Sequence, residues 1–232
     1  DGDWREFGSW FGEKMSEGGS QAVWQTFHLG TTSILLAGAL ALIVVGFSAR
    51  TLASSRPRGI WNGCPAWRAV IGSILRGVAM LGRAMPEFIL AFLLLRIFGP
   101  TVWALILALA IHNCGILMRL GAEVIDNTPS QASSVILAQG GSRTSAYIGA
   151  LVPAGFTRMV LFLFYRWESC IREATVLGML GVASLGFLIS DAKVSLYYDE
   201  MVLWIALGAA LVFLGDLTSD FVRYKLSGKN NR

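Results

Sequence analysis

The chain has few of the residues on which most soluble enzymes depend. Charged residues make up 15% of its 232 residues and hydrophobic residues 54%, whereas a soluble domain has about 25% charged residues. Its two histidines and three cysteines show no C-x-x-C and no paired His or carboxylate spacing, so neither a metal site nor a disulfide framework is predicted. No G-x-x-x-x-G-K-[ST] motif occurs, which excludes ATP binding through a P-loop.

The composition that remains is typical of a membrane protein. Mean hydropathy is +0.58, and spans of about 20 residues would fill most of the chain with five or six crossings. We therefore expect one all-α integral domain in a lipid bilayer. The net charge of +4 fits cytoplasmic Lys and Arg of a membrane protein better than a nucleic-acid partner.

The first part of the chain indicates an outer N-terminus. Residues 1–28 combine acidic and aromatic side chains, which predicts an outer segment lying at the membrane interface. A first crossing over Leu29–Ala49 is followed by Arg50, Arg56 and Arg58, so its exit is expected to be cytoplasmic.

Next comes a basic amphipathic stretch that a proline interrupts. Ala66–Arg83 carries Arg68, Arg76 and Arg83 but no acidic residue, and Pro86-Glu87 precedes the apolar run 88–98. This pattern predicts one long, proline-kinked rise. Residues 97–118 provide the return crossing, which arrives at Arg119.

The second half predicts two more crossings with a glycine-rich segment between them. The chain climbs again after residue 153, the run 174–190 is expected to fold back partway, and Met201–Gly215 begins the last crossing. Five crossings result, with a transmembrane region at 29–225, a cytoplasmic tail at 226–232, the N-terminus outside and the C-terminus cytoplasmic.

A polar stretch at 128–153, within a loop at 121–153, stands out in this apolar chain. Thr128-Pro129 is a favourable helix start and Gly140-Gly141 a favourable stop, so a short helix is predicted between them. Ala132, Val135, Ile136 and Gln139 share one of its faces. An amphipathic helix on the membrane surface is the alternative, although the Lys/Arg-rich face of such helices is missing.

This stretch resembles the cytoplasmic EAA loop of ABC importer permeases. The Gly140-to-Pro153 spacing of that pattern is kept, while its leading Glu-Ala-Ala is replaced by Ser134, Val135 and Ile136. The resemblance implies a coupling helix that docks on an ATPase. Its implied contact residues are Ser134, Val135, Ala138, Gln139, Gly140, Gly141, Ser142, Arg143 and Pro153.

Residues 163–181 resemble a block of phosphonate permeases that reads Leu-Tyr-Arg-Phe-Glu-x3-Arg-x-Ala-Thr-Val-x-Gly-x-x-Gly. Pro86-Glu87, Phe98-Gly99-Pro100 and the run 107–112 also match, so the resemblance covers about residues 20–225, with a departure at 182–186. It implies the type I permease fold with about five spans, a homodimer in the inner membrane, ATPase subunits that hold ATP and Mg, and a periplasmic binding protein. The chain itself would then be a transport subunit that binds no cofactor.

The expected function is passage of phosphonate or a related phosphorus oxyanion such as phosphite. A permease for another small solute such as methionine, or a non-transporting scaffold or channel, is the alternative. Candidate residues of the pathway are Glu87, His112, Arg166, Glu168, Arg172, Thr175, Gly178 and Gly181.

Each pathway candidate also has a structural interpretation. Arg166 and Arg172 could meet an oxyanion or form structural ion pairs, and the partners expected for Arg166 are Glu168, Glu173 or Glu87. His112 could be a packing residue and Thr175 a capping residue. Gly178 and Gly181 fit a bend or close helix packing better than a phosphate-binding loop.

Overall fold

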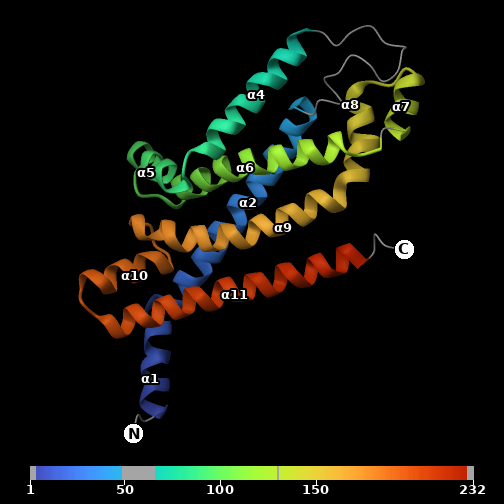
Figure 1. Cartoon of the computed structure of the whole chain (residues 1–232). Helices are drawn as coiled ribbons and strands as arrows, with labels where there is room; N and C mark the ends of the chain where they lie inside the picture. Colours follow the sequence, from blue (N-terminus) through green and yellow to red (C-terminus); the bar gives the residue numbers. More distant parts are fainter. Residues whose placement is uncertain (1–3, 49–65, 130, 229–232) are drawn as a thin grey trace. The chain divides into compact units, whose positions relative to one another are not determined.

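The computed structural model describes residues 4–48, 66–129 and 131–228, and in these ranges it contains helices and no strand. The all-α prediction is therefore confirmed. Arg50, Arg56, Arg58 and residues 229–232 lie outside the described residues. The main helices (Figure 1) are α1 Trp4–Lys14, α2 Ser20–Ser48, α4 Ala66–Ala84, α5 Glu87–Phe98, α6 Val102–Asp126, α7 Gln131–Ala138, α8 Arg143–Ala146, α9 Val152–Leu177, α10 Leu185–Val194 and α11 Tyr198–Gly228.

The number of spans agrees with the prediction of about five. Among the described residues, four helical segments are long and apolar enough to cross a membrane, Trp4–Gly46, Val102–Asp126, Thr144–Leu180 and Tyr198–Leu226, and the bent pair α4 and α5 makes up to five. The single proline-kinked segment predicted over residues 66–98 is instead two helices, α4 and α5, with Met85 and Pro86 outside both. Proline lacks the N–H of a helical bond and disfavours helical backbone at the residue before it, so the helix breaks there.

The chain forms two compact units. Unit 1 comprises Asp1–Ser33, Glu87–Leu109 and Trp167–Asp220, and unit 2 comprises Ile34–Pro86, Ala110–Arg166 and Phe221–Arg232. Helix α2 runs through the boundary predicted after residue 28. The proposed interfacial role of residues 1–28 stays a prediction.

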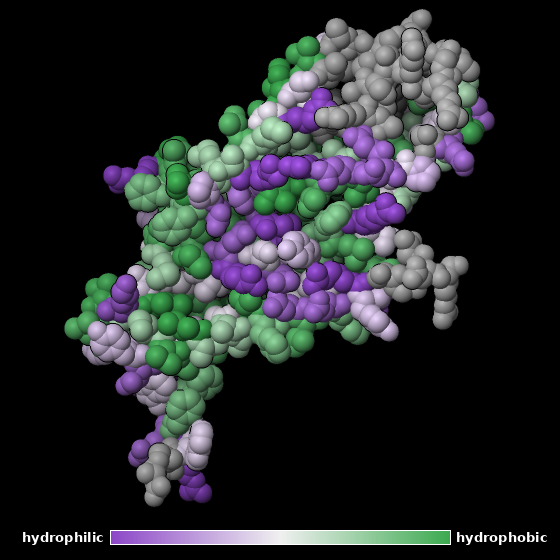
Figure 2. Space-filling view, in the orientation of Figure 1, coloured by the Kyte–Doolittle hydropathy of each residue, from purple (hydrophilic) through white to green (hydrophobic). Residues whose placement is uncertain are grey.

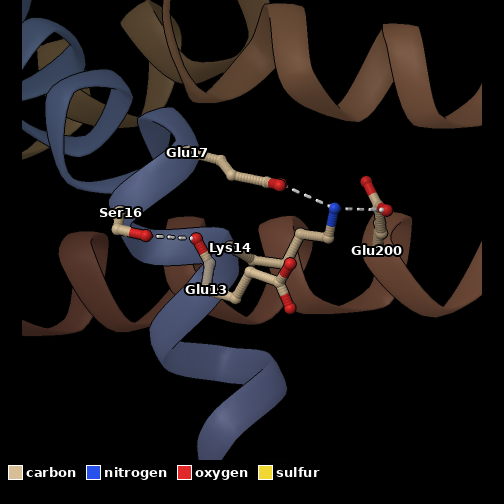
Figure 3. A network of polar contacts seen from close by, with 5 residues as sticks. All are labelled: Glu13, Lys14, Ser16, Glu17 and Glu200. Atoms are coloured by element: carbon tan, nitrogen blue, oxygen red, sulfur yellow. Dashed lines mark hydrogen bonds and ion pairs between the residues drawn. The ribbon is translucent and has the colours of Figure 1, made fainter.

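In unit 1 the N-terminal helix is tied to the start of α11. Between α1 and α2 lies a π-helical turn, Met15–Gly19, where Gly19 approaches Trp204 so closely that a Cβ would lie 2.7 Å from the indole ring. Lys14 Nζ forms ion pairs with Glu17 at 2.7 Å and with Glu200 at 3.1 Å (Figure 3). Unit 1 also contains a buried hydrophobic cluster formed by Ala22, Leu185, Ala192, Leu203 and Trp204.

Unit 1 also contains the corner between α9 and α10. A 3-10 turn over Gly178–Leu180 ends at Gly181, whose φ of 97° is left-handed. The following helix α10 has ten residues, far fewer than the roughly 20 a crossing requires. As predicted, the glycine-rich run is not a simple span.

Glycines bring the helices of unit 2 together. A Cβ at Gly121 would lie 2.9 Å from Val45, and one at Gly46 would lie 3.0 Å from the Tyr147 ring. The Tyr147 hydroxyl donates to the Leu42 carbonyl at 2.7 Å. Small residues of this kind allow close helix packing in membranes, where burial in lipid provides little driving force.

Large apolar side chains are exposed on many helices, which leaves broad hydrophobic areas on the face that Figure 2 shows. Examples are Trp67 at 56% exposed, Leu81 at 68%, Phe92 at 56% and Phe213 at 60%. Apolar areas on this scale are unusual for a soluble monomer and are expected of a surface that meets lipid or another subunit.

Replacing Gly186 by Ala should destabilise the protein. A Cβ there would collide with backbone, including the Thr175 carbonyl and the Met179 N at 2.7 Å, so we expect a loss of about 1–3 kcal/mol. Thermal unfolding in detergent measures it. The control is Gly12→Ala in α1, where a Cβ meets nothing within 4 Å and no loss is expected. Equal stability of the two variants would contradict the prediction.

Candidate functional site

Helix α7 presents a small, mainly uncharged face to the surface. Gln131, Ala132, Val135, Ala138 and Gln139 are exposed, with Val135 55% exposed. Ser133 is buried, whereas Ser134, Ile136 and Leu137 are half-buried. Of the four residues predicted to share one face, three are exposed and Ile136 is half-buried, so Ile136 lies at the edge of the exposed face. The exposed face can receive another protein without desolvating a charge.

Two glycines end this helix in the way the sequence predicted. The Gly141 N–H donates to the Ile136 carbonyl at 2.9 Å, and the Gly140 N–H donates to the Leu137 carbonyl at 3.1 Å. This pair of bonds is the Schellman motif. Gly140 has a φ of +84°, and a Cβ on Gly141 would lie 2.7 Å from the Ile136 carbonyl oxygen, so both positions require glycine.

The predicted helix start is different. Helix α7 begins at Gln131, and Thr128 belongs to the end of α6, because its hydroxyl donates to the Val124 carbonyl at 2.7 Å. Thr128 is 7% exposed. A threonine can satisfy a carbonyl of the preceding turn as readily as it can cap the following helix, and the sequence alone does not distinguish the two.

Beyond α7 the chain re-enters a long helix. Ser142 caps α8, because its hydroxyl accepts the Ser145 N–H at 3.1 Å. The side chain of Arg143 lies outside the described residues. Pro153 falls inside the continuous helical stretch 143–177, just after a π-helical turn over Tyr147–Leu151. The widened turn accommodates the loss of one helical hydrogen bond, which proline cannot make because it has no N–H.

His112 supports the helix break at Pro86. Its Nδ1 lies 3.1 Å from the Met85 carbonyl oxygen, and a carbonyl can only accept, so the imidazole donates from this nitrogen. Met85 lies outside both flanking helices, and its carbonyl needs a partner in an apolar environment. This contact favours the structural interpretation of His112.

Arg166 has a partner that the sequence analysis missed. Its Nε donates to Asn113 Oδ1 at 2.8 Å, and Asn113 is fully buried. The signal that could have found Asn113 is an amide in the middle of an otherwise uncharged crossing.

Glu168 and Arg172 lie one helical turn apart on α9 and meet a further acid on α11. Arg172 Nη2 donates to Glu168 Oε1 at 3.1 Å and lies 4.0 Å from Asp216 Oδ1. The Glu168 side chain is 16% exposed and that of Arg172 is 57% exposed. Arg172 therefore forms a structural ion pair, which was one of its two interpretations, but its partners Glu168 and Asp216 were not predicted for it.

The remaining candidates shape the α9–α10 corner. The Thr175 hydroxyl donates to the Ile171 carbonyl at 3.1 Å within its own helix. Gly181 takes the left-handed conformation that ends the turn, and a Cβ on Gly178 would overlap Ser184. These contacts agree with the bend and packing interpretation. Glu168, Arg172, Thr175, Gly178 and Gly181 belong to unit 1 with Glu87, whereas His112 and Arg166 belong to unit 2.

Another residue missed in the sequence supports α10. The Thr26 hydroxyl of α2 accepts the Leu185 N–H at 2.9 Å and donates to the Ala22 carbonyl at 2.9 Å. It thus caps α10 from another helix, while Ser184 at the cap position makes no side-chain cap bond. No local sequence pattern reveals a cap that comes from 159 residues away.

Asn113→Ala should lower stability by about 1–3 kcal/mol, because the half-buried Arg166 guanidinium loses the acceptor that the buried Asn113 provides. Thermal unfolding in detergent measures the loss. Asn127→Ala is the matched control, since Asn127 is exposed and a change within about 0.5 kcal/mol is expected there. Asn113→Asp retains the acceptor oxygen and should be milder than the alanine variant. A neutral Asn113→Ala would show that the contact contributes nothing.

Comparison with known proteins places the chain among transport components. Residues 57–229 match the family described as "Binding-protein-dependent transport system inner membrane component". The phosphate-import permease protein PhnE of Mycolicibacterium smegmatis is 30% identical over 62% of this chain and 26% of its own length. The putative phosphite transport system permease protein HtxC of Stutzerimonas stutzeri is 25% identical over 70% of this chain and 57% of its own length. The chain therefore spans only part of these relatives.

Solved structures show the same fold. A chain of the MetNI methionine ABC transporter in an inward-facing conformation aligns with a TM-score of 0.72 at 18% identity, covering 92% of this chain and 98% of that one. A chain of an amino acid ABC transporter aligns with a TM-score of 0.69 at 13% identity, covering 91% and 95%. With the fold of an ABC transporter permease and a family match over most of its length, this chain belongs to the inner membrane components of binding-protein-dependent transport systems, which are transport subunits and not enzymes.

Proposed function

We propose that the chain is the permease subunit of an ATP-driven importer and provides the translocation pathway for phosphonate or a related phosphorus oxyanion. The observation that carries the proposal is its similarity to permease proteins named for phosphate import and phosphite transport. Residues 163–181, which resemble a phosphonate permease block, support the same substrate class. The methionine transporter supports the fold alone, because it is only 18% identical.

Helix α7 is proposed as the coupling helix. Its exposed uncharged face, centred on Val135, suits a groove on an ATPase, and its Schellman end makes it a rigid element that can transmit a push. The other proposed coupling residues belong to the same loop or to the helix that follows it: Ser134, Ala138, Gln139, Gly140, Gly141, Ser142 and Pro153. ATP and Mg would be held by the ATPase, and this chain would bind no cofactor.

The other partners follow from the same proposal. A periplasmic binding protein would deliver the substrate, and a second copy of the chain would complete the pathway. The bilayer and that second copy would cover the exposed apolar side chains such as Leu81 and Phe213. The N-terminus is proposed to be outside and the C-terminus cytoplasmic.

Among the pathway candidates, the structure favours different roles. Arg172 keeps a 57% exposed side chain although it is paired with Glu168, so it could exchange that partner for a passing oxyanion. Arg166 and His112 have structural contacts to Asn113 and Met85, and we assign them to positioning the helices. Glu87, Thr175, Gly178 and Gly181 would line or shape the pathway.

Uptake by the reconstituted importer tests the substrate. Permease, ATPase and binding protein in liposomes should accumulate labelled phosphite or methylphosphonate only when ATP is supplied to the ATPase. Methionine should not be accumulated. Uptake of methionine but not of either phosphorus compound would refute the substrate assignment, and ATP-independent flux would indicate a channel.

Val135→Asp should release the ATPase, because it places a charge in the centre of the uncharged α7 face. Copurification of the ATPase with the permease measures the effect, and we expect the retained ATPase to fall by roughly tenfold or more. The control is Val194→Asp at the end of α10, where Val194 is 79% exposed. Retention of the ATPase by Val135→Asp at the control level would contradict the coupling role.

A further inference from the structure

Two helices of unit 2 border a polar cleft. It lies between α4 and α6, has a volume of about 370 Å³ and is lined by three arginines and two acids. On α4 the spacing of Arg76, Ala79 and Arg83 puts them on one face, and on α6 Gly115, Arg119, Glu123 and Asp126 share one face. The two charged faces thus border the same space.

A close helix contact holds this cleft in shape. A Cβ added to Gly115 would lie 2.6 Å from the Ala79 carbonyl oxygen and 3.2 Å from the Arg83 N. The backbones of α4 and α6 are therefore in direct contact at Gly115. Arg83 lies at this contact, and Arg119 follows Gly115 by one turn. The guanidinium groups of Arg83 and Arg119 therefore extend from a rigid frame of two helices and not from loops.

The charges of the cleft are not balanced within it. Arg119 pairs with Glu123 at 3.1 Å, and Arg76 Nη2 donates to Ser73 Oγ at 3.3 Å. Asp126 is the other acid. Arg83 is exposed, and within residues 4–48, 66–129 and 131–228 it has no ion pair. Three guanidinium groups face two carboxylates, and an uncompensated arginine on a membrane helix is costly and usually functional.

We propose that the α4–α6 cleft binds a phosphorus oxyanion through Arg83 and Arg119. A tetrahedral phosphonate or phosphate group presents three oxygens, so guanidinium forks from two helices can hold it together. A volume of about 370 Å³ accommodates a small ligand. The group could belong to a free substrate or to an anionic lipid headgroup. Its place in a transport pathway rests on the proposed function, whereas the binding itself does not.

Direct binding tests the site. The full chain in phosphatidylcholine nanodiscs is titrated into methylphosphonate, and the phosphorus-31 NMR linewidth reports the bound fraction. Saturable broadening is expected, and Arg83→Gln or Arg119→Gln should weaken binding roughly tenfold to hundredfold. Arg83→Lys, which keeps the charge but loses the fork, should be intermediate.

Arg96→Gln is the matched control. Arg96 is an exposed arginine of α5 outside the cleft, so the same change of charge there should leave binding unaltered. Size-exclusion elution checks folding, and if Arg83→Gln misfolds, Arg119→Gln and Arg83→Lys provide the test. Absence of saturable binding of either methylphosphonate or phosphatidylglycerol overturns the proposal. Equal binding by wild type, Arg83→Gln and Arg119→Gln also overturns it.

Lipid composition separates the two sources of the group. If a headgroup occupies the cleft, phosphatidylglycerol in the nanodisc should suppress methylphosphonate broadening, and Arg83→Gln should retain less of that lipid on purification. If the ligand is a free oxyanion, the lipid should have little effect. Either result supports the site and identifies its ligand.

Uptake is a separate readout. Methylphosphonate binding that depends on Arg83 and Arg119, without uptake of any phosphorus oxyanion by the reconstituted importer, would support the cleft and refute the transport proposal. Normal phosphite uptake without such binding would refute the cleft and leave the transport proposal standing.

Discussion

The structure depends on satisfying the backbone wherever a helix is interrupted. Lipid cannot hydrogen-bond a free N–H or carbonyl, so each break in a membrane chain needs a partner from the protein. The Met85 carbonyl accepts a hydrogen bond from the His112 imidazole, and the Thr26 hydroxyl accepts one from the first N–H of α10. The end of α7 closes on itself through Gly140 and Gly141, and Pro153 is accommodated by a π-helical turn. Each of these four interruptions is thus matched to a specific residue.

This constraint changes how the polar residues of the spans are interpreted. In sequence, a histidine or threonine in an apolar helix is a candidate for the transport pathway. In the structure, His112 and Thr175 donate to backbone carbonyls, and Arg166 donates to a buried amide. Side chains engaged in this way hold helices in place. Arg172 and Arg83 are more exposed and are better suited to meet a passing anion.

Glycine has a complementary role, because it lets helices meet without a hydrophobic driving force. Gly115 brings α4 against α6, and Gly186 brings α10 against the end of α9. The close packing at Gly115 lies beside the charged cleft. The close packing at Gly186 forms the corner before α10, a helix too short to cross a membrane. A rigid contact next to a polar space is a suitable arrangement for holding a ligand with few side chains.

The sequence by itself determined the class, the approximate number of spans, the break at Pro86 and the glycine stop of α7, because hydropathy, proline and left-handed glycine act locally. Similarity at residues 128–181 also indicated the permease family. The tertiary structure alone decided that Thr128 bonds back to α6, that Ile136 is half-buried, and that Asn113, Thr26 and Asp216 partner distant groups. The contacts of Asn113, Thr26 and Asp216 join residues far apart in the chain, and no local periodicity encodes them. The Thr128 bond is local, but the sequence permits two local partners and the structure selects one.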